Sequence, residues 1–469
     1  MEIINSINDI LWTYLLVAVL LGAGVYFTIR LGGAQFTMIG EMFRLLIKSG
    51  HKHDDSSDLE EPTTKRISSF QAFVVSLASR VGTGNIAGVA IAIVLGGPGA
   101  VFWMWVVALV GSANAFVEST LAQLFKVRGD HSYIGGPAYY IMKGIGKRWY
   151  ANLFAILITV TFGLAFTSVQ SNTMAIALHS SFGVDSWIVG VVCTVLTMAV
   201  ICGGIQRIAK INEIVVPVMA VMYIGLAVYV VLTRISMFPH VMELIFENAF
   251  GFNQAIGGTF GMAVIMGVKR GLFSNEAGEG STPNAAATAA VSHPVKQGLI
   301  QTLGVFTDTL FVCTATAFII LCSGVFDSGL TGIELTQLAL EGEVGHAATI
   351  FVALAVIMFA FTSVIANYFY GEANLRFINP SVKLRNWFRV CVGVVVMIGA
   401  IVSLDMAWAM ADITMALMTL CNIVAIVILG RYAVICLKDY RHQLKAGHDP
   451  VYHRSTIPEI ADKTECWPE

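Results

Sequence analysis

Long apolar runs separated by short polar segments extend along nearly the whole chain of 469 residues. A run of about 20 apolar residues is long enough to cross a lipid bilayer as an α-helix. We therefore predict eleven membrane-spanning segments, at residues 9–29, 67–95, 98–125, 150–179, 186–204, 212–233, 255–292 (broken), 297–323, 347–371, 386–404 and 407–436. Residues 34–50 place Arg44 and Lys48 among apolar residues, which is typical of an amphipathic helix on a membrane surface.

The loops between these segments differ in their content of Lys and Arg. The basic loops are 30–66, 126–148, 207–210, the position Lys296, 376–389 and 438–454. The intervening loops contain almost no basic residue, and Arg234 is the exception. Because loops rich in Lys and Arg stay on the cytoplasmic side, this pattern predicts an external N-terminus and a cytoplasmic C-terminus. An odd number of spans agrees with that orientation.

Composition supports a membrane protein and excludes several other classes. The chain is 56% hydrophobic and 12% charged, which is about half the charged fraction of a soluble domain. Its net charge of -2 argues against a nucleic-acid partner. The eight cysteines lie mostly in apolar runs without a C-x-x-C pair, so we interpret them as free thiols. The first nine residues contain no Lys or Arg, so no cleaved signal peptide is expected.

Two polar, glycine-rich sequences interrupt the predicted spans. The first, Ser79–Gly88, contains three glycines and an asparagine, and the second, Gly271–Ser281, has five polar side chains among its glycines. Such runs should unwind a helix, and in lipid the freed backbone groups must bond within the protein or to a ligand. Discontinuous helices at the middle of a membrane are typical of the binding site of a secondary transporter.

The two breaks also predict an internal repeat. The third helix after each break begins about 65–70 residues later, and the fifth ends about 150–160 residues later. Five helices are an odd number, so the second unit would be inverted relative to the first. A competing position for the second break, Gly257–Gly261, suits the charge rule for Lys269 and Arg270 but makes the repeat spacing about 20 residues too long.

The sequence contains three distinctive motifs, at Ala78–Ala90, at the glycine-rich Leu95–Ala100 and at Arg270–Gly278. These motifs resemble those of a known family, the alanine/glycine:cation symporters, and the resemblance covers nearly the whole chain. The fold of that family is similar to that of the bacterial leucine transporter. Two local matches support the link, Val81-Gly82-x-Gly84-Asn85 in the broken first core helix and Ala360-x-Thr362-Ser363 in the eighth.

The resemblance implies an all-α polytopic membrane protein with a core of two inverted five-helix repeats and one extra N-terminal helix. Four regions follow from it. Residues 1–66 hold the extra helix, the amphipathic helix and a polar linker at 51–66, residues 67–233 and 234–436 hold the two repeats, and residues 437–469 form a cytoplasmic tail. We expect that tail to be disordered or lightly helical. The expected location is the bacterial inner membrane, as a monomer or weak oligomer in the lipid bilayer.

An amino-acid zwitterion needs two opposite surfaces in its site. Exposed N–H groups of Gly82, Thr83, Gly84 and Asn85 at a half-helix N-terminus suit the carboxylate. Free carbonyl and hydroxyl groups at Phe273, Ser274 and Asn275 suit the ammonium group. By resemblance to the family, the amide of Gln170 also faces the substrate. From the residue alone, the more common role of a glutamine in a membrane helix is to form an interhelical hydrogen bond.

Sodium prefers roughly five or six oxygen ligands from carbonyls and hydroxyls. The resemblance makes Thr362 and Ser363 sodium ligands, together with the backbone carbonyls of Ala78, Val81 and Phe359. Without the resemblance, adjacent hydroxyls in a membrane helix bond back to the preceding turn. No cofactor is expected apart from sodium as the coupling ion.

The sequence departs from many relatives at two places. Ala366-Asn367 stands where they carry Gly-Trp, so the pocket is expected to be roomier, which keeps a larger substrate such as glutamine open. Cys421-Asn422 replaces a Pro-Asn pair in the last core helix. Arg80 beside the first break is expected to pair with Glu276 or Glu279 of the second, because intramembrane charges need partners.

These features predict a sodium-coupled symporter of small neutral amino acids, alanine or glycine. Proton coupling through a carboxylate such as Glu276, or transport of glutamine, are the alternatives within the same fold. An intramembrane enzyme is disfavoured because no nucleophile motif or metal-ligand spacing occurs. A channel is disfavoured because two discontinuous helices suit an occluding site better than an open pore.

Overall fold

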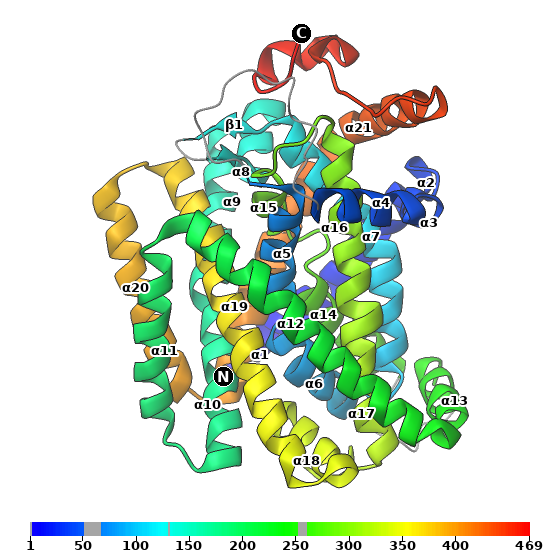
Figure 1. Cartoon of the computed structure of the whole chain (residues 1–469), viewed down its shortest axis with the longest axis vertical. Coiled ribbons are helices and arrows are strands. Elements are labelled where there is room, and N and C mark those ends of the chain that lie inside the picture. The colour runs from blue at the N-terminus through cyan, green and yellow to red at the C-terminus, as the bar shows by residue number, and fades with distance from the viewer. Residues whose placement is uncertain (1, 51–66, 130–131, 252–259) are drawn as a thin grey trace.

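The computed structural model describes residues 2–50, 67–129, 132–251 and 260–469, and these are almost wholly helical. Long helices lie side by side along the long axis of the molecule, and the C-terminal segment covers one end, which we term the tail end (Figure 1). Within the described residues, strands β1 (Val127–Arg128) and β2 (Tyr133–Ile134) form a small antiparallel hairpin at the tail end. The prediction of an all-α architecture is therefore correct.

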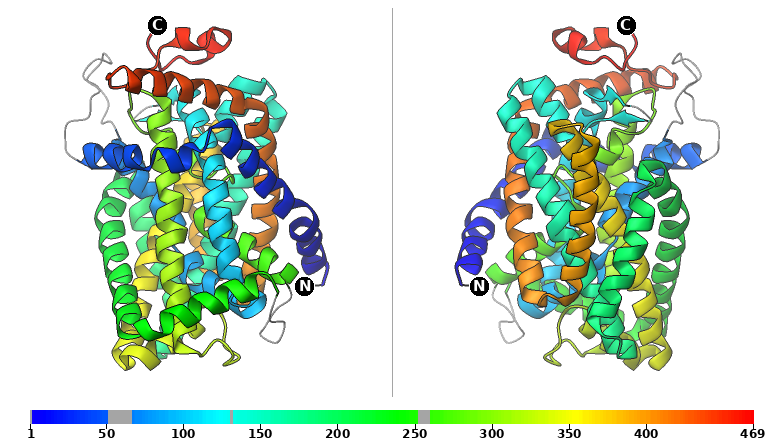
Figure 2. Two further views of the ribbon diagram at one scale, coloured as in Figure 1. Left: turned by 90° about the vertical axis from the view of Figure 1, so that its right-hand side faces the viewer. Right: turned by 90° about the vertical axis from the view of Figure 1, so that its left-hand side faces the viewer.

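The N-terminal segment lies outside the main bundle. Its elements are α1 (Glu2–Asp9), the π-helical turn η1 (Ile10–Leu16) and α2 (Val17–Arg30), followed by α3 (Ala34–Thr37) and α4 (Ile39–Gly50). Trp12 is buried and its indole donates to the carbonyl of Asp412 at 3.3 Å, so this segment is fixed to the bundle. Helix α4 lies across the ends of the long helices (Figure 2), with Met42 buried and Ile47 exposed.

The first half of the bundle follows after the segment 51–66, which lies outside the described residues. Its elements are α5 (Ser69–Arg80), η2 (Gly84–Gly88), α6 (Val89–Gly96), α7 (Ala100–Leu124), α8 (Pro137–Tyr140), η3 (Ile141–Ile145), α9 (Arg148–Val160), η4 (Thr161–Phe166), α10 (Thr167–Phe182), α11 (Ser186–Ile201) and α12 (Gly204–Thr233). Ser68 begins α5 with a capping box in which its hydroxyl accepts from the Gln71 N–H.

The second half repeats the order of a broken helix and then a long one. Its elements are η5 (Ile235–Met237), α13 (Phe238–Ala249), α14 (Phe260–Asn275), α15 (Pro283–Ala286), α16 (Pro294–Phe306), η6 (Thr307–Cys313), α17 (Thr314–Ser323), α18 (Gly332–Val344), α19 (His346–Ile378), α20 (Val382–Ile401), α21 (Leu404–Lys445), η7 (Arg454–Thr456) and η8 (Pro458–Lys463). The sequence did not predict α13 or α18, which lie at the end opposite the tail (Figure 1).

Eight helical segments of the described chain are long and apolar enough to cross a membrane, and the bent pair Ser69–Arg80 with Gly84–Gly96 makes a ninth. Two further predicted spans coincide with α11, which is apolar but shorter, and with the interrupted pair α14 and α15. Apolar side chains such as Val221 on α12 and Ile398 on α20 are 73% and 57% exposed, as expected of surfaces that face lipid. The count of eleven spans stays a prediction.

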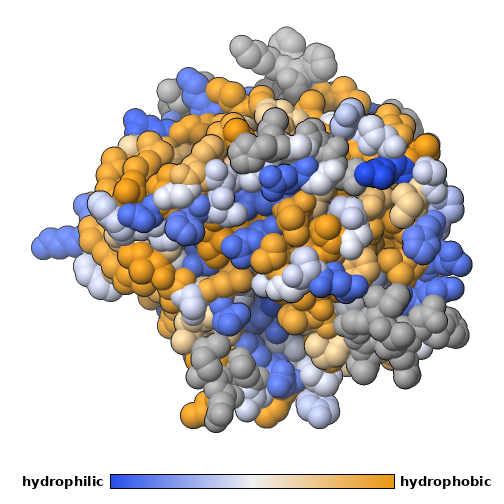
Figure 3. Space-filling model, turned by 90° about the horizontal axis from the view of Figure 1, so that it is seen from below, coloured by the Kyte–Doolittle hydropathy of each residue, from blue (hydrophilic) through white to orange (hydrophobic). Residues whose placement is uncertain are grey.

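The end of the molecule opposite the tail has a surface of mixed hydropathy (Figure 3). Hydrophilic residues are scattered among hydrophobic ones across the end opposite the tail (Figure 3). Segments α13 and α18 lie at this end and connect the long helices there (Figure 1). A mixed surface of this kind suits the boundary between lipid and water.

Of the two expected alternatives for the tail, disorder is wrong, because residues 437–469 are folded and lightly helical. Helix α21 continues to Lys445, and the chain then folds back over the tail end. Tyr452 and Trp467 are buried, and the Trp467 indole donates to the carbonyls of Gln123 and Leu124 at 3.2 Å each. The tail is polar in composition, but its few aromatic residues are enough to fix it on the end of α7.

Candidate functional site

The first break occurs where it was predicted. Helix α5 ends at Arg80, the helix resumes at Gly84, and the two parts are bent by 48°. Val81 leaves the helix with ψ of 84°, which turns the chain away from the axis of α5. Residues between the two parts lie outside the regular helical bonding pattern, so their polar groups need other partners.

Two side chains bond to the N–H groups of this break. Asn85 Oδ1 accepts from the Gly82 N–H at 2.9 Å, and Gln170 Oε1 accepts from the Thr83 N–H at 3.0 Å. A Cβ atom at Gly82 would lie 2.5 Å from Ser363 Oγ and 3.0 Å from Gln170 Oε1. Helices α5, α10 and α19 therefore converge on Gly82, and only glycine fits there.

The second break begins at Glu276, directly after α14. Glu276 has φ of +56°, the only positive φ of a non-glycine residue in the described chain. Its carboxylate lies 2.6 Å from Ser79 Oγ of α5 and also accepts from Ser281. The structure thus supports a break at Ser274–Gly280. The competing position at Gly257–Gly261 falls mostly outside the described residues.

Glu118 on α7 holds the second break in place. Its carboxylate accepts from the N–H groups of Gly278 at 3.1 Å and Gly280 at 3.0 Å, and from Asn422 Nδ2 at 2.8 Å. Asn422 also donates to the Gly278 carbonyl at 2.9 Å. The backbone groups released by the break are therefore bonded inside the protein by α7 and α21, as a low-dielectric surrounding requires.

Asp308 in η6 joins the two breaks. Its carboxylate accepts from Asn85 Nδ2 at 2.6 Å, from Ser274 Oγ at 2.8 Å and from Thr309 Oγ1 at 2.9 Å. Asn85 belongs to the first break and Ser274 to the end of α14, so one buried carboxylate contacts both discontinuous helices. In the sequence, the only sign of this role is that Asp308 is a charged residue within an apolar run.

Aromatic rings lie beside these polar groups. Phe273 packs between Phe166 and Trp408, with ring centroids 4.4 Å and 4.6 Å away. Its ring also lies against Gly84, where a Cβ atom would be 2.8 Å from Phe273 Cδ1. Phe166 and Trp408 were not among the predicted site residues, because an aromatic residue in an apolar run has no distinguishing sequence pattern.

Four of the five predicted sodium ligands have their oxygens close together. Ser363 Oγ lies 2.7 Å from the Ala78 carbonyl and 2.9 Å from the Phe359 carbonyl. Thr362 Oγ1 lies 2.9 Å from the Met358 carbonyl and 3.0 Å from that of Phe359. The fifth, Val81, precedes Gly82, which lies against Ser363. Neutral hydroxyl and carbonyl oxygens are the ligands that a hard cation accepts.

The remaining predicted residues lie nearby but have other bonding partners. Asn275 Nδ2 donates to Thr309 Oγ1 at 3.3 Å, and Asn367 Oδ1 lies 2.9 Å from Ser79 Oγ. Arg80 forms no ion pair with Glu276 or Glu279 among the described residues. Its guanidinium donates instead to the Gln301 carbonyl at 3.1 Å and to Thr282 Oγ1 at 3.2 Å, because these α16 and second-break oxygens are nearer. The expected pairing is wrong.

Comparison with known proteins gives a consistent picture. A model of the sodium:alanine symporter family matches residues 1–454. The chain is 49% identical over 468 residues to the probable sodium/glutamine symporter GlnT of Bacillus subtilis (strain 168), covering 100% of this chain and 96% of that protein. It is 50% identical over 466 residues to the amino-acid carrier protein AlsT of the same organism, covering 99% and 97%.

A more distant relative and two solved structures extend this comparison. The sodium/alanine symporter AgcS of Methanococcus maripaludis is 36% identical over 443 residues, covering 92% of this chain and 95% of that protein. The crystal structure of MhsT in complex with L-phenylalanine is similar with a TM-score of 0.56 at 13% identity, covering 86% and 93%. A mutant of the Eremococcus coleocola manganese transporter gives a TM-score of 0.52 at 13% identity, covering 88% and 96%. These structures show a shared leucine-transporter-type fold.

Proposed function

Because the chain belongs to the sodium:alanine symporter family, we propose that it takes up a small neutral amino acid, alanine or glycine, together with sodium by alternating access. The observation that supports this most is the convergence of two broken helices with Gln170 and Ser363. Discontinuous helices present free backbone N–H and carbonyl groups to a bound substrate or ion.

The substrate would replace partners that the break already has. A carboxylate near Gly82 and Thr83 would take the N–H groups that now donate to Asn85 and Gln170. The ammonium group of the substrate would lie toward the carbonyls at the end of α14, near Phe273 and Ser274. The rings of Phe273 and Trp408 would enclose a small side chain.

Sodium would bind at the adjoining oxygens of Ala78, Val81, Phe359, Thr362 and Ser363. Ser363 also lies against Gly82, so the ion site and the substrate site share a contact. Binding of either sodium or the amino acid would therefore order the same part of the first break and so favour binding of the other. The coupling free energy needed by a symporter is about 1–3 kcal/mol, and it is reciprocal.

The choice between alanine, glycine and glutamine depends on the pocket wall. Relatives of this chain are named for alanine and for glutamine. Asn367 lies near Ser79 and adds an amide where a larger apolar ring would fill space. We propose that this amide makes room for the polar side chain of glutamine as a second substrate.

A proton-coupled cycle is the second candidate, and one observation favours it. Glu279 is fully buried, and neither of its carboxyl oxygens has a hydrogen-bond partner among the described residues. An ionised carboxylate in such a place is costly, so this side chain favours a bound proton. Its release and uptake during the cycle would couple transport to protons.

We further propose that the protein lies in the bacterial inner membrane with an external N-terminus, a cytoplasmic tail end and two inverted repeats at 67–233 and 234–436. The basic loops and the repeated order of a broken helix followed by a long helix support this arrangement. We also propose that the protein is a monomer or a weak oligomer.

Uptake of labelled alanine into proteoliposomes tests the function. We expect an inward sodium gradient to drive accumulation, and Thr362→Ala to reduce it at least tenfold because one ion ligand is lost. Thr414→Ala is the matched control, since Thr414 also bonds back to the preceding turn of its helix but is only half-buried and lies outside the proposed site. Uptake that is driven by a pH gradient alone and is lost in Glu279→Gln would show that the coupling ion is a proton and not sodium. Equal uptake by both threonine variants would overturn the sodium site.

A further inference from the structure

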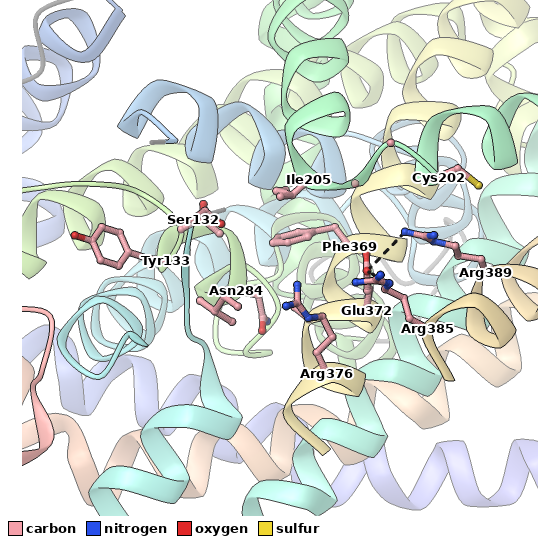
Figure 4. Close-up of a pocket in the computed structure, with 15 residues that line it drawn as sticks. Ser132, Tyr133, Cys202, Ile205, Asn284, Phe369, Glu372, Arg376, Arg385 and Arg389 are labelled. Atoms are coloured by element: carbon pink, nitrogen blue, oxygen red, sulfur yellow. Dashed lines mark ion pairs between the residues drawn. The ribbon is translucent and has the colours of Figure 1, made fainter. Parts of the chain in front are cut away.

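A cavity of about 230 Å³ lies at the tail end, apart from the two breaks. It is enclosed by the start of α12, by α15, by the last turns of α19, by the first turns of α20 and by the β1–β2 hairpin (Figure 4). Its lining includes Asn284, Glu372, Arg376, Arg385 and Arg389. A water molecule takes about 30 Å³ in the liquid, so the cavity has room for a polyatomic ion with its waters.

The cavity carries an excess of positive charge. Arg376 and Glu372 are four residues apart on α19, and Arg385 and Arg389 are four residues apart on α20, so each helix presents two charged groups on one face. Figure 4 shows Arg385 and Arg389 reaching toward Glu372. Among the described lining residues, one carboxylate thus stands against three guanidinium groups, which leaves a net charge of about +2.

The two arginines of α20 hold this carboxylate only loosely. Arg385 Nε lies 3.6 Å from Glu372 Oε1, and Arg389 Nη2 lies 4.0 Å from the same oxygen. Both distances exceed the usual range of a hydrogen bond, which ends near 3.2 Å. Arg385 Nε is shielded from solvent and has no hydrogen-bond partner among the described residues. A guanidinium fork in this state is suited to a phosphate or carboxylate oxygen.

We propose that this arginine-lined cavity binds a phosphate group, and that its source is the headgroup of an anionic phospholipid. The surface beside the cavity supports that source. On α20, Trp387 and Val390 are 65% and 57% exposed, although they lie within one turn of Arg385 and Arg389. A lipid could therefore place its headgroup among the arginines and its acyl chains along α20. Basic pockets between helices recognise anionic lipids in this way.

Such a lipid would tie α19 to α20 at the tail end. Its phosphate would complete the bonding of Arg385 and would neutralise part of the excess charge. The proposal does not depend on what the protein transports, because its site shares no residue with the two breaks.

Thermal unfolding of the purified full chain in detergent tests it. We expect added phosphatidylglycerol to raise Tm in a saturable way and phosphatidylcholine to have no such effect. The double variant Arg385→Gln/Arg389→Gln should bind phosphatidylglycerol at least about tenfold more weakly, because charge-assisted hydrogen bonds are lost. Arg431→Gln is the control, since Arg431 is exposed and pairs with Glu459 elsewhere on the tail end.

Inorganic phosphate at constant ionic strength distinguishes the two sources. Stabilisation by phosphate that the double variant loses would support the site and assign it a soluble anion in place of a lipid. Equal stabilisation of the double variant and of the unaltered chain by phosphatidylglycerol would overturn the proposal, as would no stabilisation by either ligand. If the double variant does not fold, Arg376→Gln, which leaves both α20 arginines beside Glu372, is tested in its place with phospholipid retention counted by native mass spectrometry.

Discussion

Position 82 admits nothing larger than a hydrogen atom as its side chain. A Cβ atom there would meet a hydroxyl of α19 and an amide of α10, and both belong to the proposed binding sites. The constraint is one of packing and bonding together, because neither neighbour can withdraw without losing its own hydrogen bond to the backbone.

The variant Gly82→Ala tests this constraint. We expect at least a tenfold loss of uptake, since the added methyl group separates Ser363 from Gln170 and displaces the substrate and the ion together. Gly225→Ala is the control, because no atom lies within 4 Å of a Cβ at this helical position of α12. If the two variants transport equally well, the first break does not lie where the substrate binds.

At the scale of elements, the sequence predicted helices better than it predicted their contacts. Hydropathy and glycine content were enough to locate the long helices between α5 and α21 and both breaks, since lipid requires long apolar runs and glycine interrupts them. Helices α13 and α18 were missed because they are too short and too polar for a span. The folded tail was missed because its burial depends on Tyr452 and Trp467, two aromatic residues in a polar segment.

The site shows the same limit. The motifs identified residues of both breaks, and the resemblance added Thr362, Ser363 and Gln170. Asp308, Glu118 and Trp408 come from other elements, and their roles follow from distances between helices that a sequence does not contain. Arg80 shows the same limit from the other side. The sequence predicted that it pairs with a glutamate of the second break, but in the structure it bonds to neutral oxygens.

The second break depends on a bond to another element, which gives a prediction for Glu118→Gln. The amide would place an N–H group against donors that now meet a carboxylate, so at least one buried donor loses its partner. We expect a loss of roughly 3 kcal/mol of stability and a lower Tm, together with reduced uptake. Glu459→Gln, which removes an exposed pair with Arg431, should change Tm little. A Glu118 variant as stable as that control would show that the break holds its shape unaided.

At the scale of the whole molecule, the tail joins segments that are far apart in sequence. Lys126, directly after α7, is buried between the rings of Tyr133 and Trp467, 4.1 Å and 4.4 Å from their centroids. Its ammonium group donates to Gln123 Oε1 at 2.8 Å and to the Ala289 carbonyl at 3.3 Å. The hairpin, α7, the chain after α15 and the last residues therefore meet at one side chain.

Burial lowers the pKa of Lys126 from 10.5 to about 7, and this predicts a pH dependence. Between pH 7 and 10.5 the unfolded chain binds more protons at this residue than the folded chain does. Its contribution to stability therefore rises with pH over this range, by up to about 1.4 kcal/mol per pH unit. We expect the Tm of the unaltered chain to rise relative to the Tm of Lys126→Met as the pH increases from 7 to 9.5. Parallel Tm curves would contradict the shift.

The buried indole of Trp467 has a further consequence for how the protein is made. Its partners on α7 are separated from it by more than 340 positions in the sequence. A ribosome makes α7 long before it makes Trp467, so this contact cannot form while the growing chain lacks that residue. A chain cut before Trp467 keeps every long helix but leaves the end of α7 uncovered, with Lys126 deprived of one of its rings. The docked tail thus distinguishes chains that contain Trp467 from chains truncated before it.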